Sequence, residues 1–256
     1  MQTGALTSYL DVAQLTLYAF WVFFIGLIWY LRQEDKREGY PLISDRPESP
    51  ILEGIPPMPA PKTFLLRGGG TYQAPPGTIE RRPIAAEPQE IWPGAALEPT
   101  GDPLRDQVGP ASYAERHDTP DLTAEGEPMI VPLRVAKGFY VEGRDPDPRG
   151  MTVIAADGET AGTVTDIWVD RSEPQIRFLE VDVAAGGGTK LLPIYYARID
   201  GKRRQVKVKA LLARQFADVP AIANPDQITL LEEDRILAFF GGGHLYAEPS
   251  RMEPVI

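Results

Sequence analysis

An uncharged stretch of twenty residues near the start of the chain restricts its fold more than any other feature. From Val12 to Leu31 the sequence reads VAQLTLYAFWVFFIGLIWYL, without one charged side chain. At about 1.5 Å per residue, a helix of this length spans roughly 30 Å, the hydrocarbon thickness of a bilayer. A cleaved signal peptide is disfavoured, because no basic residue precedes the run and no A-x-A-like site ends it. The stretch therefore predicts a transmembrane helix over residues 12–31, with Trp29 and Tyr30 at one interface and Tyr9 near the other.

The charges that flank this span predict its orientation. Asp11 precedes it, whereas Arg32, Lys36 and Arg37 follow it in the segment RQEDKRE. Basic residues are enriched on the cytoplasmic side of membrane helices. We therefore expect residues 1–11 to be periplasmic and the chain after Arg32 to be cytoplasmic. The same basic segment could also be a contact for anionic lipids.

Composition excludes several classes of function. The net charge is −10 and the pI is about 4.8, which argues against nucleic acid as a partner. The absence of cysteine removes disulfides, iron–sulfur ligation and thiolate catalysis. Only His117 and His244 could supply imidazole, and they are far apart in sequence. A metal site built by this chain is therefore not expected.

The region from residue 32 to residue 110 is rich in proline. More than half of the chain's 26 prolines fall between Tyr40 and Pro110, in runs such as IPPMPAPK. Proline fixes φ and removes a backbone donor, so this juxtamembrane segment should be extended and short of regular structure. Its scattered apolar pieces indicate that it lies against a surface and takes its order from it.

Residues 111–256 are predicted to form a mainly β domain. Short β-rich runs separated by turn signals fill residues 130–210, as in a small closed or half-closed β-barrel. In QVKVKAL, Val206 and Val208 should face the core, away from the flanking lysines. Thr229 and Glu232 form a capping-box pattern that predicts a helix over residues 230–241, ended by the three glycines at 241–243. This helix should pack on the barrel through Ile236, Leu237 and Phe240.

Several motifs, in one order along nearly the whole chain, resemble a known family. They are RQEDKREGYPL, PTGDP followed by VGPASYAER, IVPLRVA, DPDPRGMTV, DGETAGTVTDIWVDRSEPQIRFLEV, FADVP, PDQITLLEED and GGGHLYA. Together they resemble the H subunit of purple-bacterial photosynthetic reaction centres. Residues 151–210 also resemble the wider PRC-barrel class, which indicates a fold and leaves the function open.

The resemblance implies a non-enzymatic subunit of the bacterial inner, intracytoplasmic membrane. Its partners would be the reaction-centre L and M subunits and membrane lipids, in a complex that can include antenna polypeptides and a cytochrome subunit. The complex would hold bacteriochlorophyll, bacteriopheophytin, quinones and non-haem iron, none of them bound by the H subunit. The H subunit would stabilise the L/M core, shield the quinone sites and conduct protons to the secondary quinone. The histidine-free span agrees with a chain that ligates no pigment.

The resemblance also implies a proton-transfer residue. A family glutamate follows the DIWVD strand, and Glu173 in DRSEPQ occupies that position. Such a carboxylate would relay protons inward. Arg177 is its candidate charge partner, although both residues could also be ordinary solvated side chains.

A second family feature, a surface patch at the proton entrance, differs in this sequence. Thr123 stands where the family has an aspartate, and Glu125 and Glu127 stand where it has histidines. Carboxylates can relay protons but have lower ordinary pKa values than imidazole. The entry point therefore stays open, with Glu125 and Glu127 as candidates and His117 as a further possibility nearby in sequence.

Two other classes of function compete with this interpretation. A membrane-tethered PRC-barrel adaptor for another cytoplasmic protein would have the same anchor and fold. An antenna polypeptide is discouraged by the histidine-free span and the large extramembrane domain. No nucleophile elbow or phosphate-binding loop is present: the GGG runs at 68–70, 186–188 and 241–243 are better explained as turns and caps.

Overall fold

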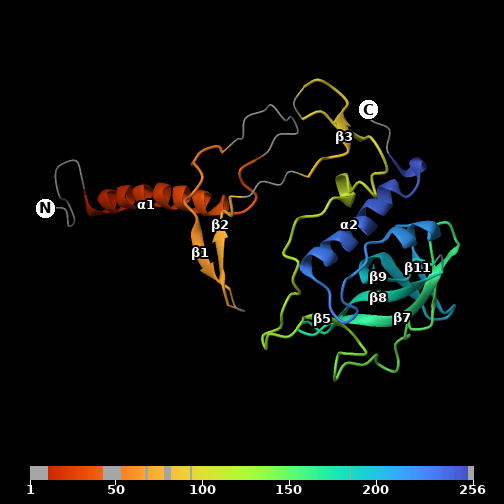
Figure 1. Ribbon diagram of the computed structural model, residues 1–256. Helices are drawn as coiled ribbons and strands as arrows, with labels where there is room; N and C mark the ends of the chain where they lie inside the picture. The colour runs from red at the N-terminus through yellow and green to blue at the C-terminus, as the bar shows by residue number, and fades with distance from the viewer. Residues whose placement is uncertain are drawn as a thin grey trace. The chain divides into compact units, whose positions relative to one another are not determined.

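The fold was analysed in a computed structural model of the whole chain (Figure 1). The structure describes residues 11–42, 53–66, 69–77, 82–92, 94–184 and 186–252. Tyr9, expected at a membrane interface, lies outside these ranges. The chain divides into two compact units, one of residues 1–82 with 92–94 and one of residues 83–91 with 95–256. Each unit is described by itself.

Helix α1 (Val12–Asp35) contains the whole predicted span (Figure 1). A capping box opens it: the Asp11 carboxylate accepts from the Gln14 N–H at 2.7 Å, and the Gln14 side chain accepts from the Asp11 N–H. None of its residues is buried, so the apolar surface that a soluble helix would cover is open along its length. The helix continues one turn past Leu31, where Arg32 and Asp35 form an ion pair at 3.2 Å. Length and exposed apolar surface thus match a helix embedded in a bilayer.

The proline-rich region contains two small hairpins that its composition did not predict. Strands β1 (Lys62–Leu65) and β2 (Thr71–Ala74) pair antiparallel, as do β3 (Ala86–Pro88) and β4 (Leu97–Pro99). Prolines are tolerated here because every strand of a two-stranded hairpin is an edge strand with one unpaired side. The rest of the described part of this region is mostly irregular, as expected.

The main sheet of the second unit has seven strands. Its strands are β5 (Ile130–Pro132), β6 (Thr152–Ile154), β7 (Thr160–Asp170), β8 (Gln175–Val183), β9 (Thr189–Pro193), β10 (Ala197–Asp200) and β11 (Gln205–Val208). The order is β10-β11-β6-β7-β8-β9, with β5 also paired to β7. All pairs are antiparallel except β11 with β6. The ends of this path, β9 and β10, are joined in sequence by the short 3-10 helix η2 (Ile194–Tyr196). Three further 3-10 helices are η1 (Gly109–Ala111), η3 (Ala213–Asp218) and η4 (Pro249–Arg251).

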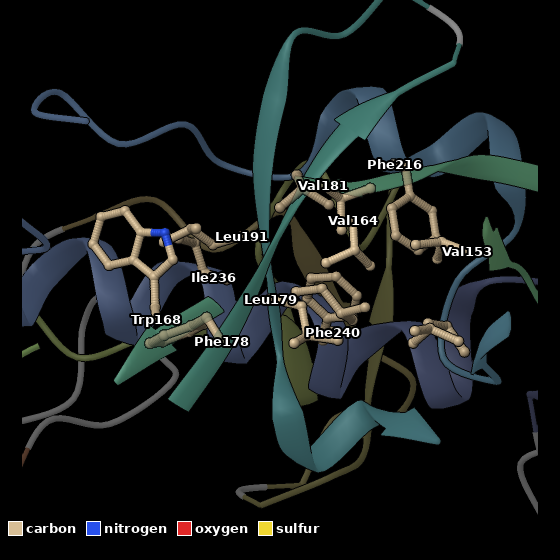
Figure 2. Packing of buried hydrophobic residues seen from close by; sticks show 14 of the residues in the cluster. Val153, Val164, Trp168, Phe178, Leu179, Val181, Leu191, Phe216, Ile236 and Phe240 are labelled. Atoms are coloured by element: carbon tan, nitrogen blue, oxygen red, sulfur yellow. The ribbon is translucent and has the colours of Figure 1, made fainter. Parts of the chain in front are cut away.

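The hydrophobic core lies between this sheet and the C-terminal helix α2 (Leu230–Tyr246). Figure 2 shows side chains of β6, β7, β8, β9, η3 and α2 in one cluster, including Val164, Leu179 and Phe240. The rings of Phe216 and Phe240 meet edge to face with centroids 5.9 Å apart. Each fully buried side chain of this size contributes about 1.5–3 kcal/mol. The predicted alternation in β11 is confirmed, since its two valines are buried and Lys207 is not.

The capping box of α2 is present as predicted. The Thr229 hydroxyl accepts from the Glu232 N–H at 3.1 Å, and the Glu232 carboxylate accepts from the Thr229 N–H at 2.9 Å. Ile236 and Phe240 are fully buried and Leu237 is half-buried, so the expected face packs on the domain. The cap satisfies backbone donors that the first turn of a helix would otherwise leave unpaired.

The predicted end of this helix was wrong, because α2 continues through the glycines to Tyr246. A Cβ on Gly242 would lie 2.5 Å from the Ala111 Cβ, and one on Gly243 would lie 2.6 Å from the Ala210 carbonyl oxygen. These glycines therefore let η1 and the chain after β11 approach the helix backbone closely. Buried contact compensates for the roughly 1 kcal/mol that each glycine costs in helix propensity.

Candidate functional site

The turn between β7 and β8 presents Glu173 to solvent. Asp170, the last residue of β7, is buried, and its carboxylate accepts from the N–H groups of Ser172 at 2.9 Å and Glu173 at 3.0 Å. These two bonds hold the turn. Glu173 itself is exposed, and the Gln175 side-chain amide donates to its carboxylate at 3.2 Å. The predicted proton-transfer residue thus sits on an ordered turn with its carboxylate open to a partner surface.

A second turn carries Glu125 and Glu127. Thr123 is buried, and its hydroxyl accepts from the N–H groups of Glu125 at 3.3 Å and Glu127 at 3.4 Å. The Thr123 N–H also donates to the Glu127 carbonyl at 2.8 Å, which closes the turn. Both glutamates are exposed. This threonine organises the turn through a hydroxyl that accepts backbone hydrogen bonds.

The sheet brings these two turns together. Strand β5 pairs with β7 so that Ile130 lies opposite Asp170, and the turns continue from the paired ends. Arg171 joins them: its Nε donates to the Pro128 carbonyl at 2.9 Å, and its Nη2 lies 3.8 Å from the Glu127 carboxylate. Glu125, Glu127 and Glu173 are therefore grouped at one end of the sheet. The sequence did not identify Arg171 as a site residue, because in this turn the family motif pointed to Glu173 alone.

Arg177 does not pair with Glu173, which corrects the predicted ion pair. Its guanidinium donates instead to the buried carboxylate of Glu233 on α2, at 2.8 Å. Burial alone would lower the pKa of Arg177, but the hydrogen bond and charge of Glu233 and the charge of Asp170 raise it. Glu233 was missed, although a signal existed: it precedes Ile236 by three residues and Phe240 by seven, which places it on the buried face of the helix.

His117 lies on an exposed segment that contacts the start of α2. The neighbouring Asp118 accepts a hydrogen bond from the Thr229 hydroxyl at 2.8 Å, and the Leu230 N–H donates to the Thr119 carbonyl. This places His117 near the first turn of the helix that carries Glu233. His117 therefore remains a candidate proton-entry residue at the edge of the site.

A further ionic cluster ties the chain just after β5 to strands β7 and β8. Arg134 donates to the carboxylates of Asp166 at 3.0 Å and Glu180 at 2.9 Å, and the Trp168 indole also donates to Glu180 at 2.9 Å. Burial would lower the pKa of Arg134, but hydrogen bonds and attraction from these two carboxylates raise it. Because the cluster connects strands of one sheet, we assign it a structural role. Among the described residues, no group of three or more histidine, aspartate or glutamate side chains is arranged to hold a metal ion.

In the first unit, two basic residues after α1 bind the proline-rich chain. The Lys36 ammonium donates to the carbonyl oxygens of Glu53 and Pro56. Arg37 donates to the carbonyls of Ala60 at 2.8 Å and Ala74 at 2.9 Å, and it also pairs with Glu34. Both cations are buried, unlike the exposed Arg32. The two cations that follow the apolar helix thus do more than flank it, because they attach parts of the proline-rich chain to its end.

Replacing Arg37 with methionine is expected to loosen this attachment. Methionine keeps apolar bulk but loses the donors to Ala60 and Ala74. Bonds from a charged donor are worth about 1.5–3 kcal/mol, so we expect trypsin cleavage after Lys62 to accelerate at least about tenfold. The measurement is limited proteolysis of the full-length protein in detergent. Arg32→Met, which removes an exposed cation, is the control; equal cleavage of both variants would refute the attachment.

Two family models match the chain. The model of the photosynthetic reaction centre H-chain N-terminal region matches residues 4–135, and the PRC-barrel domain model matches residues 141–214. The first match contains α1, the basic residues that hold the proline-rich chain and the turn with Glu125 and Glu127. The second contains the β7–β8 turn with Glu173. Since the H-chain model covers more than half of the sequence, this chain belongs to the H-chain family of the photosynthetic reaction centre.

Proposed function

We propose that this chain caps the L and M subunits of a reaction centre on the cytoplasmic side, shields their quinone sites and conducts protons to the secondary quinone. Family membership makes it a structural subunit that associates with other reaction-centre subunits, in a complex with pigments and quinones. The apolar helix α1 anchors it in the membrane as a single-pass protein. We propose, beyond this, that the partners are the L and M subunits and that this chain conducts protons.

One observation carries the proton role: three exposed carboxylates gather at one end of the sheet. Glu125 and Glu127 lie on one turn and Glu173 on the next, with Arg171 between the turns. Reduction of a quinone to quinol consumes two protons, which can reach a buried site only through titratable groups and water. A partner subunit covering this end of the sheet would place these carboxylates between bulk water and a buried quinone site.

The ion pair between Arg177 and Glu233 supports the same site. It fastens the start of β8 to α2 behind the β7–β8 turn. In the proposed mechanism the pair is a positioning element, and the three exposed glutamates exchange protons.

The orientation of the anchor is also part of the proposal. Arg32, Lys36 and Arg37 follow the span and Asp11 precedes it, a distribution typical of a periplasmic N-terminus and a cytoplasmic domain. Lys36 and Arg37 count toward this orientation although their side chains bind backbone carbonyls. With this topology, the carboxylate-bearing domain is on the side from which cytoplasmic protons are taken up.

Copurification tests the partner assignment. After gentle detergent extraction, we expect this chain to be recovered with two pigmented, multi-span subunits in equal amounts, measured by gel analysis and absorption spectra of one chromatographic peak. Recovery alone, or only with soluble proteins, would contradict the proposal and favour the membrane-tethered adaptor.

A further inference from the structure

The hairpin of β10 and β11 is strongly basic in an otherwise acidic protein. Residues 197–209 contain six basic side chains and one acidic side chain, while the whole chain has a net charge of −10. The basic residues occupy the two strands, the turn between them and the position after β11: they are Arg198, Lys202, Arg203, Arg204, Lys207 and Lys209. Most of this charge is not used by the fold: Val206 and Val208 are buried on the opposite face, and of the three turn cations only Arg204 donates to a backbone carbonyl among the residues that the structure describes, that of Arg149 at 3.2 Å.

The arrangement of these charges is unfavourable in the isolated chain. Arg198 and Lys207 lie directly opposite each other across the antiparallel pair, where like charges destabilise a sheet. Asp200 offsets this only weakly, since it lies 3.8 Å from the Lys207 ammonium. Within the described part of the chain, no carboxylate lies within ion-pair distance of Arg198, Lys202, Arg203 or Lys209. Such a face is stabilised when it meets a surface of negative charge.

The hairpin lacks the apolar anchors of a protein interface. Protein–protein interfaces usually contain exposed aromatic or aliphatic residues that become buried hot spots. No large hydrophobic residue between positions 196 and 251, all of which the structure describes, is exposed. The same absence argues against single-stranded nucleic acid, whose bases stack on aromatic side chains. Long cationic side chains on a hairpin at the edge of the sheet fit a diffuse layer of anionic headgroups better.

We propose that the β10–β11 hairpin binds the anionic lipid surface of the membrane in which α1 is anchored. Because the domain is covalently tethered to α1, its effective concentration at this surface is high, so a weak electrostatic contact is sufficient. Each lysine or arginine near an anionic leaflet strengthens such binding several-fold. The contact would give the second unit an attachment to the bilayer of its own, in addition to the anchor α1.

Fluorescence energy transfer in nanodiscs tests the proposal on the full-length protein. The chain has no cysteine, so Gln205→Cys provides one labelling site on the exposed face of the hairpin without changing its charge. The acceptor is a headgroup-labelled lipid. We expect efficient transfer in discs of mixed phosphatidylglycerol and phosphatidylcholine, and little in phosphatidylcholine alone. Transfer should also fall at high salt, because about 1 M salt shortens the screening length to about 3 Å.

Charge-neutralised variants distinguish the hairpin from general electrostatics. Replacing the three turn residues together (K202Q, R203Q, R204Q) should weaken the membrane-bound state about 100-fold. The matched control (K137Q, R144Q, R214Q) removes three exposed cations elsewhere in the same unit and should leave transfer unchanged. Transfer that is independent of phosphatidylglycerol and salt would overturn the proposal, as would transfer that rises only when other reaction-centre subunits share the disc.

Discussion

Replacing Glu173 with glutamine is expected to slow the proton-coupled transfer of the second electron to the secondary quinone about 100-fold. This lies at the lower end of what a positioned proton donor contributes, because Glu125 and Glu127 at the same end of the sheet can carry part of the proton flux. Glutamine keeps the side-chain size and can still accept from Gln175, but it cannot release a proton. The measurement is flash-induced absorption kinetics of the intact complex across roughly pH 6 to 9.

Glu159→Gln is the matched control for this prediction. Glu159 is also an exposed glutamate, but it precedes the first residue of β7, whereas Glu173 follows the last. The first electron transfer, which needs no proton at the quinone oxygen, should be unaffected in both variants. Equal rates for E173Q and the unmodified complex at every pH would remove Glu173 from the proton path, without bearing on whether the chain is a reaction-centre subunit.

Replacing Gly243 with alanine is expected to reduce the free energy of unfolding by about 2 kcal/mol. In an exposed helix the same change would stabilise by up to about 1 kcal/mol, because alanine is the better helix former. Here the new Cβ would lie 2.6 Å from the Ala210 carbonyl oxygen and 2.5 Å from the Leu211 side chain, so backbone must move. Overpacking of this kind typically costs about 1–3 kcal/mol. Chemical denaturation in detergent, followed by tryptophan fluorescence, measures the change.

Gly241→Ala provides the comparison within the same helix. Its Cβ would lie 3.3 Å from the nearest atoms, the Pro110 carbonyl oxygen and the Tyr196 hydroxyl, a fit that needs only a small shift. The gain in helix propensity should roughly offset that shift, leaving stability within about 0.5 kcal/mol. If both alanines were tolerated equally, close packing could not be the reason that α2 contains glycine.

Several features could be predicted because they depend on neighbours in the sequence. The apolar run of α1, the capping box at Thr229 and Glu232 and the alternation of Val206 and Val208 each involve residues only a few positions apart. Local periodicity and capping report these directly. The family motifs add the position of Glu173, since they preserve order and spacing along the chain.

The contacts that make up the candidate site depend on which distant segments meet. The pairing of β5 with β7 places Glu127 beside Arg171, and the docking of α2 gives Arg177 its partner Glu233 in place of Glu173. Sequence spacing suggested the nearer glutamate because it reports proximity along the chain alone. An ion pair across 56 positions requires the whole sheet and helix to be assembled first.

The glycines of α2 and the cations after α1 also separate what the sequence determines from what the tertiary structure decides. By itself the sequence determined that residues 241–243 are poor helix formers and that Lys36 and Arg37 are positive charges beside a membrane span. Only the tertiary structure decided that Gly242 and Gly243 admit neighbouring backbone inside a continuing helix, and that the two cations bind carbonyl groups of the proline-rich chain. A local conformational preference is worth about 1 kcal/mol per residue. Burial and hydrogen bonds from charged donors can stabilise a different arrangement by more than that, and the tertiary structure then overrides the local preference.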